Sequence, residues 1–418
     1  PRQLLWSPKS PGTTNTQQFR EFVNKKRGLS LVTYADLYTW SVTDIEEFWS
    51  DVSEYTRTIF SKCCVSVLEK DKTMDQVPKW FIGAELNYTE NVLGTMADNP
   101  SVAIYSVGEG IPLRLLTFSQ LYDQVRLCAS AMRKLGIVAG DRPKCLVHSA
   151  GGILLQHRKE HQISQDLGPT DILFYYTTTG WMMWNWLVGA LSVGTAIVLY
   201  EGSPFKPDSG TLWSLIDSLG VTAFGTSAKY IQSLEDIGYK PIEHHQLDTL
   251  RYIYSTASPL KPSNFDFVYE HIKRDVCLSS ITGGTDICSL FCGANTSLPV
   301  YRMAVESWVG DKQPVLGESG DLVCVKPFPC MPAFFWGDHD GKRYKAAYFD
   351  HYPNIWYHGD FVMINPNTGG VHMLGRSDGT LNPAGVRFGS AELYNIVDIY
   401  AEVADSLVVG QKQGVDER

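Results

Sequence analysis

"LRYIYSTASPLKPSNFDFVYEHIKRDVCLSSITGGTD", residues 250–286, is the stretch that determines the fold class. "LRYIYS" predicts a strand that ends in the turn "TASPL", and "KPSNFDFVYEHI" predicts a helix. "VCLSS" predicts a second strand, which runs into the glycine-rich loop "ITGGTD". Strands that alternate with helices indicate a parallel sheet, and ligands bind outside the carboxyl ends of such strands. The segments 256–259 and 281–286 are therefore the first places to look for function.

The same alternation continues on the N-terminal side. "WMMWNWLVGALSVGTAIVLY", residues 181–200, has no charge and the length of a membrane span. However, a helix-like half ends at Gly194 and the β-branched run "TAIVLY" ends at the turn "EGSP", which indicates a buried helix followed by a buried strand. From about residue 316, short strands separated by glycine and proline turns indicate a smaller β-rich subdomain. The predicted fold class is α/β, with parallel or mixed sheets, helices on both faces and a small β-rich subdomain.

Composition excludes several classes of protein. The 418 residues are enough for two or three subdomains, and 44% hydrophobic with 19% charged residues is typical of a folded globular chain. A net charge of -9 without a basic stripe argues against nucleic-acid binding. Nine cysteines without a Cys-x-x-Cys pair indicate reduced thiols in the cytosol. Cys288 and Cys292 lie four apart, but no histidine or second pair accompanies them, so we predict no metal site there. The opening "PRQLLWSPKSPGT" has no apolar core of a signal peptide.

Four segments that follow predicted strands occur in a fixed order: "YSTASPLKP", "SSITGGTDI", "WYHGDFV" and "GRSDGTLNPAGVRFGSAEL". Together with "FWSDVSEYT", "WFIGAELNYTENVL" and "GWMMWNW", they make the chain resemble the adenylate-forming superfamily of acyl-CoA synthetases, and within it the acetoacetyl-CoA synthetases. The resemblance extends over the whole chain. It implies that a carboxylate attacks the α-phosphate of ATP to give an acyl-adenylate and pyrophosphate, after which the thiol of coenzyme A displaces AMP.

Asp360 and two arginines form the centre of the nucleotide site that the resemblance implies. Asp360, in "HGD", matches the family's ribose-binding aspartate, because one carboxylate can accept both ribose hydroxyl protons; the alternative is an aspartate in a turn. Arg376 and Arg387 match arginines that hold the ribose and the α-phosphate; the alternative is a pair of surface charges. Asp378 matches the hinge about which the family's C-terminal domain rotates between the two half-reactions.

The glycine-rich loop and the turn before it complete the implied nucleotide site. Thr285 is expected near the phosphate, and Asp286 stands where most of the superfamily has glutamate, as a carboxylate linked to Mg²⁺, with a water between them if its reach is too short. Thr285, Asp286 and Arg387 are the implied catalytic residues. The remaining implied nucleotide-binding residues are Lys144, Ala257, Ser258, Pro259, Thr282, Gly283 and Gly284. A plain β-turn is the alternative for residues 257–259.

The resemblance also implies the lining of an acyl pocket, formed by Trp181, Met182, Met183, Thr256 and Gly283. The related acetyl-CoA synthetases carry tryptophan at the position of Gly283, so glycine leaves room for a longer acyl chain. Acetoacetate fits this expectation, and its extra carbonyl could accept a hydrogen bond from Thr256. The alternative is that Gly283 serves only the conformation of its loop.

The chain departs from the family pattern at three places. The loop rich in serine, threonine and glycine that cradles the β- and γ-phosphates should precede "PKCLVHSAGG", but "VAGDR" stands there, which indicates a gap between Arg142 and Pro143. A short stretch is missing after "LPVYR", between Arg302 and Met303, and the sequence stops at "GVDER", where the C-terminal domain begins. Two explanations are open: a shortened polypeptide, or a sequence that joins residues not consecutive in the protein. We favour the second, because a parallel sheet that lacks internal strands would expose its core.

The resulting organisation has four parts. Residues 1–100 form an N-terminal segment of the acetyl-CoA synthetase type, 101–315 the α/β adenylation subdomains, 316–377 the β-rich subdomain, and 378–418 the hinge and the start of a mobile C-terminal domain that is largely absent. The leading function is ligation of acetoacetate to coenzyme A with ATP and Mg²⁺, in the cytosol. The alternatives are a synthetase for another short-chain acid and a truncated form that binds nucleotide without turnover. We expect small-molecule partners only, with no nucleic acid and no membrane span.

Overall fold

The computed structural model describes residues 4–135, 146–301, 307–309, 313–315, 317–366, 371–377, 397, 412–413 and 416–417. The predicted site residues Lys144, Asp378 and Arg387, and the join between Arg142 and Pro143, lie outside this part of the chain.

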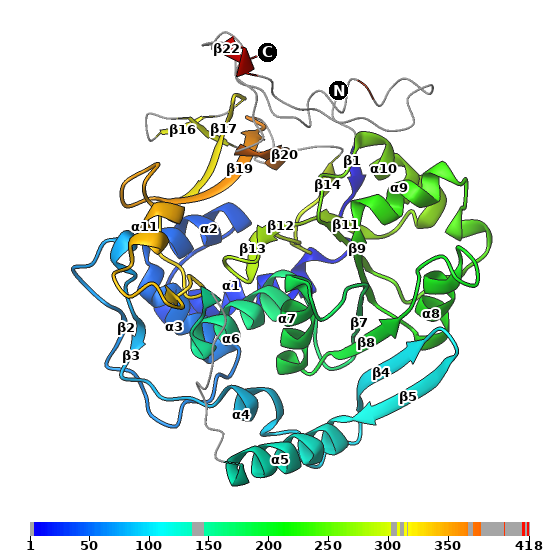
Figure 1. Ribbon diagram of the computed structural model, residues 1–418, viewed down its shortest axis with the longest axis horizontal. Helices are drawn as coiled ribbons and strands as arrows, with labels where there is room; N and C mark the ends of the chain where they lie inside the picture. The colour runs from blue at the N-terminus through cyan, green and yellow to red at the C-terminus, as the bar shows by residue number, and fades with distance from the viewer. Residues whose placement is uncertain are drawn as a thin grey trace.

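A seven-stranded sheet forms the centre of the molecule (Figure 1). Its strand order is β11-β10-β9-β7-β8-β4-β5, and all neighbouring pairs are parallel except β4 with β5. The strands are β4 (Val102–Gly108), β5 (Ile111–Thr117), β7 (Ile172–Tyr175), β8 (Ala196–Glu201), β9 (Ala223–Ser227), β10 (Tyr252–Thr256) and β11 (Cys277–Ser280). The α/β class predicted from the sequence is confirmed.

Helices cover both faces of this sheet, so its strands are apolar on both sides. One face packs α6 (Ala150–Arg158) and α7 (Met182–Gly189), and the other packs α8 (Thr211–Leu219), α9 (Ala228–Asp236) and α10 (Pro262–Phe267) (Figure 1). Successive strand residues alternate between the two cores, as the pleat requires. One core contains Leu173, Ile197, Ala223, Tyr254 and Cys277, and the other contains Phe174, Val198, Phe224, Ile253 and Leu278.

The charge-free stretch 181–200 is a buried helix followed by a buried strand, as its sequence predicts. Helix α7 continues into a 3₁₀ turn, Ala190–Val193, which ends at Gly194 with φ +80° before β8 begins. A left-handed residue after the last turn is easiest for glycine, which has no Cβ. Within the described ranges, no helix is long and apolar enough to cross a membrane.

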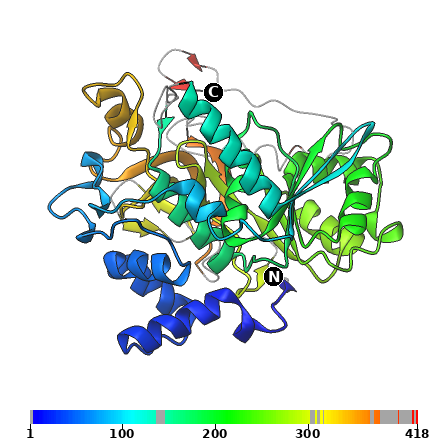
Figure 2. The same cartoon turned by 90° about the horizontal axis from the view of Figure 1, so that it is seen from below.

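Three N-terminal helices form a separate layer against the π-helical turn that continues α6 at Lys159–Ser164 (Figure 2). They are α1 (Asn15–Arg27), α2 (Tyr34–Thr43) and α3 (Ile45–Tyr55). Helix α2 starts with a reciprocal capping box, in which Thr33 accepts from the Asp36 N–H and Asp36 accepts from the Thr33 N–H. The core of this layer includes Phe19, Val23 and Val52, none of which is exposed.

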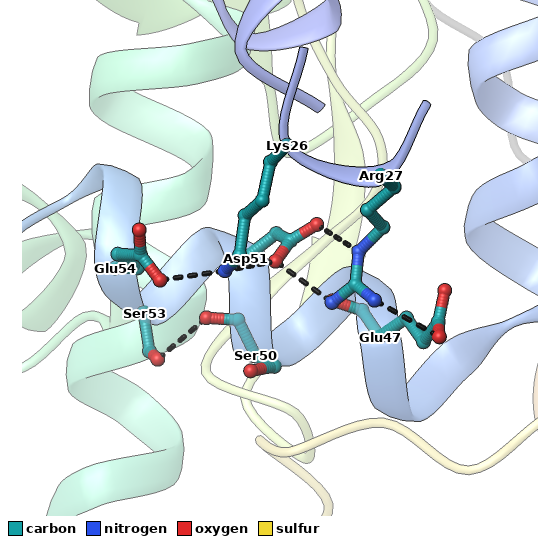
Figure 3. A network of polar contacts seen from close by, with 7 residues as sticks. All are labelled: Lys26, Arg27, Glu47, Ser50, Asp51, Ser53 and Glu54. Atoms are coloured by element: carbon teal, nitrogen blue, oxygen red, sulfur yellow. Dashed lines mark hydrogen bonds and ion pairs between the residues drawn. The ribbon is translucent and has the colours of Figure 1, made fainter. Parts of the chain in front are cut away.

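A buried carboxylate ties α1 to α3 in this layer (Figure 3). Asp51 is fully buried, and its two oxygens accept from Arg27 Nε at 2.5 Å and Arg27 Nη2 at 2.9 Å. Lys26 Nζ lies 2.7 Å from Asp51 and 2.5 Å from Glu54. Burial alone would lower the pKa of Lys26, but its hydrogen bonds to Asp51 and Glu54 raise it above the usual value.

A second, antiparallel sheet has the order β16-β15-β17-β19-β20. Its strands are β15 (Ser307–Val309), β16 (Gln313–Val315), β17 (Ser319–Cys324), β19 (Trp356–Ile364) and β20 (Val371–Arg376). The sheet therefore includes two strands that precede the expected start of the β-rich subdomain at residue 316. Helix α11 (Lys342–Tyr348) packs beside β19, where Tyr348 stacks on Trp356 with ring centroids 3.8 Å apart.

The remaining elements lie outside the two large sheets and the N-terminal helical layer. The helices α4 (Tyr88–Leu93) and α5 (Phe118–Lys134) flank the β4–β5 hairpin in the chain. The 3₁₀ turns are Pro11–Thr13, Met74–Gln76 and Pro241–Glu243, and a π-helical turn, Val268–Ile272, continues α10. Paired short strands are β1 (Leu4–Trp6) with β14 (Val300–Tyr301), β2 (Ser66–Leu68) with β3 (Trp80–Ile82), β6 (Leu146–Val147) with β18 (Phe334–Phe335), β12 (Thr282–Gly284) with β13 (Ser289–Cys292), and β21 (Lys412–Gln413) with β22 (Asp416–Glu417).

Among the described residues, little packs on the β5 edge of the central sheet. Strand β5 ends the strand order, and its Leu113 and Leu115 are 46% and 54% exposed. Leu127 of α5 and Leu135, the C-cap residue of that helix, are 61% and 77% exposed. A folded chain rarely leaves neighbouring apolar residues of one edge in water unless something else covers them.

Candidate active site

The candidate site lies at the end of the central sheet where its parallel strands terminate. Strands β7, β9, β10 and β11 are parallel, so their carboxyl ends lie side by side there. The turn 257–259 follows β10, the loop 281–286 follows β11, and Trp181 lies six residues after β7. The topology therefore brings together the three segments for which the resemblance implies nucleotide and acyl contacts.

The turn after β10 presents its residues to solvent. Ala257 has φ +76°, a left-handed conformation, and Ala257, Ser258 and Pro259 are exposed. The Thr256 hydroxyl, at the end of β10, donates to the Ile281 carbonyl at 3.1 Å. This hydrogen bond ties the turn to the glycine-rich loop of the neighbouring strand.

Strands β12 and β13 form a tight hairpin in which two glycines face β13. Gly283 lies opposite Leu290 and Gly284 opposite Ser289, with a register shift between Thr282 and Gly283. A Cβ on Gly283 would lie 2.0 Å from the Ser289 carbonyl oxygen and 2.8 Å from the Leu290 Cα. Glycine at a strand irregularity often marks such a close backbone approach. The structure thus supports the explanation that Gly283 serves the conformation of its loop.

Asp360 and Arg376 face each other across β19 and β20. Their Cα atoms are register partners, and Arg376 Nη1 donates to Asp360 Oδ1 at 3.3 Å and to the His358 carbonyl at 3.4 Å. Asp360 is 7% exposed, whereas the Arg376 side chain is 58% exposed. The pair thus combines a nearly buried acceptor with a cation that reaches solvent.

His358 connects this pair to the glycine-rich hairpin. Its Nε2 lies 3.7 Å from Asp360 Oδ2, and its ring packs on Phe291 of β13 with centroids 4.7 Å apart. Trp356 Nε1 donates to His358 Nδ1 at 3.4 Å, which leaves the ring proton on Nε2. Burial lowers the pKa of His358, although Asp360 and a hydrogen bond with the Gly283 backbone raise it. A neutral imidazole therefore joins the hairpin to Asp360.

Asp286 and Thr285 end the glycine-rich loop. Thr285 is exposed, and Asp286 is half-buried and accepts a hydrogen bond from the Tyr348 hydroxyl of α11. Burial and the Asp286 charge raise the pKa of Tyr348, so it stays protonated and remains a donor. The loop is in this way fixed to the helix beside the second sheet.

The residues predicted for the acyl pocket have unequal environments. Trp181, which precedes the first residue of α7, is 69% exposed, while Met183 is 7% exposed and packs in the core with Trp186. Met182 and Thr256 are half-buried. Trp181, Met182 and Thr256 are thus the members of the set with accessible side-chain surface.

A separate cleft of about 980 Å³ lies between the N-terminal segment and the start of α6. Its walls include Trp80, Phe81, Gly151 and Phe328. Of the predicted site residues that the structure describes, none lines this cleft. The candidate site is therefore defined by the strand ends and the two sheets, and this cleft is a different feature.

Comparison with known proteins identifies the class. A family model described as the acetyl-coenzyme A synthetase N-terminus matches residues 34–92, and one described as AMP-binding enzyme matches residues 142–310. The two matches cover the helices α2 and α3 and the strands β7 to β11, whose carboxyl ends carry the site. They define an AMP-binding enzyme of the acyl-CoA synthetase type.

Individual relatives narrow the class further. Acetoacetyl-CoA synthetase of Gallus gallus is 38% identical, with 98% of this chain and 84% of that protein covered. A malonamoyl-CoA synthetase of Penicillium aethiopicum is 31% identical over 99% of this chain and 80% of its own length. The solved acetoacetyl-CoA synthetase of Streptomyces lividans is 29% identical, with a TM-score of 0.88, and 98% of this chain and 85% of that chain are covered.

The chain belongs to the acetoacetyl-CoA synthetase family. Members of this family are acid–thiol ligases that form AMP and use ATP and Mg²⁺, with coenzyme A as co-substrate. The resemblance drawn from the sequence is thereby confirmed.

Sequence reasoning missed two residues of this site. His358 precedes Asp360 by two in "HGD", and with Gly359 between them at φ +80° their side chains lie 3.7 Å apart, so the motif contained the signal. Tyr348 carried no signal, because its contact with Asp286 arises from the packing of α11 against a loop 62 residues earlier.

Proposed function

We propose that this chain catalyses the ATP-dependent ligation of acetoacetate to coenzyme A through an acetoacetyl-adenylate, releasing pyrophosphate and then AMP. The observation that carries this proposal is the junction of Asp360, Arg376 and His358 with the glycine-rich hairpin, in a chain similar to acetoacetyl-CoA synthetases over 98% of its length.

The junction offers the groups that adenylate formation needs. The Asp360 carboxylate can accept hydrogen bonds from the ribose hydroxyls, and the exposed Arg376 guanidinium can donate a hydrogen bond to a phosphate oxygen beside it. Ala257, Ser258 and Pro259 supply an exposed turn against which the adenine can pack. Arg387 and Lys144 are further proposed contacts of the nucleotide, and Asp378 is the proposed hinge.

Asp286 fits a role as a magnesium ligand. Mg²⁺ prefers one or two carboxylates together with substrate phosphates and waters. The Tyr348 hydroxyl, which donates to Oδ1, holds the Asp286 carboxylate beside α11. Mg²⁺ bound there would neutralise phosphate charge, and Thr285, which is exposed beside Asp286, is the proposed neighbour of the phosphate.

The acid is proposed to be a short chain with a carbonyl on its third carbon. The fungal relative is named for malonamate, which has the shape of acetoacetate with an amide nitrogen in place of the methyl group. The Thr256 hydroxyl, between the turn and the loop, is the proposed contact for the third-carbon carbonyl, by giving up its hydrogen bond to Ile281. Because only the terminal group differs, the two acids have to be separated by experiment.

A panel of acids tests this proposal. Pyrophosphate release in the presence of ATP, Mg²⁺ and coenzyme A is measured with acetoacetate, malonamate, butyrate and acetate. The proposal expects the highest kcat/KM for acetoacetate, with butyrate lower because it lacks the carbonyl. A preference for acetate or butyrate would contradict the assigned acid, and nucleotide binding without any release would indicate the truncated form.

We further propose that Arg142 and Pro143 are not consecutive in the working protein. The alignment with the chicken protein runs over 560 positions, so at least 142 of them (560 − 418) face no residue of this chain. The AMP-binding match begins at residue 142. The exposed apolar residues of β5 and α5 shortly precede this position in the chain, and strands inserted after residue 142 would cover them. An intact mass of about 47 kDa for the isolated enzyme would contradict the idea, since the printed chain has a mass of 46.7 kDa.

The proposed compartment is the cytosol. Among the described residues, eight cysteines are free, including the exposed Cys63 and Cys128. Free exposed thiols persist where glutathione keeps them reduced. Fractionation of cells that express a tagged enzyme tests this placement.

A further inference from the structure

A buried acid outside the candidate site makes hydrogen bonds to two elements that border the site, α7 and β13. Glu160, on the π-helical turn after α6, is 2% exposed. Gln156 Nε2 donates to its Oε1 at 2.7 Å, and Lys159 Nζ lies 4.0 Å from the same oxygen. Burial by itself raises the pKa of this carboxyl, but Lys159 and the hydrogen bonds from Ser289 and Gln156 lower it below the usual value, so the group is an anion.

The two oxygens of Glu160 point to different parts of the site. Oε2 accepts from Trp186 Nε1 of α7 at 2.8 Å. Oε1 accepts from the Ser289 hydroxyl and from the Leu290 N–H, the latter at 3.4 Å, and both residues belong to β13. One carboxylate therefore links the helix that begins beside Trp181 with the hairpin that carries Gly283 and Gly284.

Two histidines strengthen the same link. His157 Nε2 donates to the Cys288 carbonyl at 2.8 Å, just before β13, and His161 Nε2 donates to the Trp186 carbonyl at 2.9 Å. Both imidazoles are buried, and burial lowers the pKa of each, so both are neutral. The π-helical turn thus makes side-chain contacts with both walls at once.

We propose that Glu160 is a positioning residue that couples the acyl pocket to the nucleotide loop. The inference rests on the proposed function, because it takes α7 as the wall of the acyl pocket and the hairpin as the wall of the nucleotide site. If nucleotide fixes the hairpin, the Glu160 link fixes α7, and the acid then binds to a preformed wall. By linkage, bound acid must strengthen nucleotide binding by the same factor.

Glu160→Gln tests the coupling with little change of shape. A glutamine has one acceptor oxygen, so if it accepts from Trp186, its NH₂ faces the Leu290 N–H, a donor that it cannot satisfy, and the Ser289 hydroxyl must reverse from donor to acceptor. Asp171→Asn is the matched control, because Asp171 is 4% exposed against 2% for Glu160 and is also held by a cation, Arg251, and by hydrogen bonds from Thr222 at 2.7 Å and Gly168 at 3.0 Å. It precedes β7, so it lies at the end of the sheet opposite to the candidate site. Both variants lose a buried carboxylate, and only one loses the link.

The measurement is calorimetric affinity for acetoacetate with and without saturating AMP, using the full enzyme, together with kcat and KM for each substrate. We expect AMP to strengthen acetoacetate binding at least about 5-fold in the wild type and in Asp171→Asn. In Glu160→Gln we expect a factor below 2 and a kcat about 10-fold lower.

Three outcomes decide the question. Equal coupling in Glu160→Gln and Asp171→Asn overturns the inference and leaves the proposed function intact. A wild type that binds neither ligand overturns the proposed function and this inference with it. If Glu160→Gln does not fold, Ser289→Ala removes only the hydroxyl donor of the hairpin side, and unchanged coupling in that variant overturns the inference.

Discussion

Replacing Gly283 by alanine is expected to destabilise the β12–β13 hairpin strongly. The added Cβ would lie 2.0 Å from the Ser289 carbonyl oxygen, whereas a comfortable carbon–oxygen contact is about 3.3 Å. The two strands must therefore separate by roughly 1 Å or more. Overpacking of this kind costs about 1–3 kcal/mol.

Separation of the strands has a second cost. The Ser289 hydroxyl and the Leu290 N–H both donate to the buried Glu160 carboxylate, and moving β13 weakens both bonds. A hydrogen bond to a charged group contributes about 1.5–3 kcal/mol. Together we expect Gly283→Ala to lower the free energy of unfolding by roughly 3–5 kcal/mol.

Urea unfolding followed by tryptophan fluorescence measures this loss. Gly284→Ala is the matched control, because its Cβ would lie 3.4 Å from His358 Nε2, an ordinary contact, and we expect a change within about 1 kcal/mol. Equal stability of the two variants would refute the close-approach argument. Gly283→Trp is expected to lose stability for the same reason, and a stable Trp variant that prefers acetate would support Gly283 as a pocket wall.

Three further predictions concern single side chains. Asp360→Asn should raise the KM for ATP at least about 10-fold by removing an acceptor for ribose and a partner of Arg376, with the unfolding midpoint as control; an unchanged KM would contradict the ribose role. Asp51→Asn should lower the free energy of unfolding in urea by about 3 kcal/mol, because Asp51 is fully buried. Glu54→Gln is the control, and because the Glu54 side chain is 57% exposed it should lower that free energy by less than about 0.5 kcal/mol. Equal losses in the two variants would contradict the importance of the buried ion pair. Burial lowers the pKa of His161 from 6.5 to about 4, so the unfolded chain binds a proton more readily than the folded one. As the pH is lowered from 6.5 to 4, the free energy of unfolding should therefore fall by about 3 kcal/mol more in the wild type than in His161→Gln, and parallel pH profiles would contradict this prediction.

The sequence predicted those features that local pattern and burial specify. The strand–helix–strand order of residues 250–286 and the helix-to-strand transition at Gly194 were predictable, because apolar runs, turns and glycine act over a few residues. The resemblance implied that Asp360 and Arg376 both contact the nucleotide, but their pairing with each other was not predicted, since it depends on the register of β19 with β20.

Contacts between distant elements were not predictable. Glu160 lies on a helix with no unusual pattern, and its bonds to Trp186 and Ser289 span 26 and 129 residues. The close approach of β13 to Gly283 likewise depends on a strand irregularity that leaves no periodic signal. Such contacts are set by the packing of whole elements, which single-residue preferences do not encode.

Acetoacetate-dependent exchange of labelled pyrophosphate into ATP tests the central claim most directly, because it reports adenylate formation without coenzyme A. We expect the full enzyme to catalyse this exchange with Mg²⁺, to lose it without acetoacetate, and to lose most of it in Asp360→Asn. Binding of ATP without acetoacetate-dependent exchange would contradict the assignment of ligase activity to this chain.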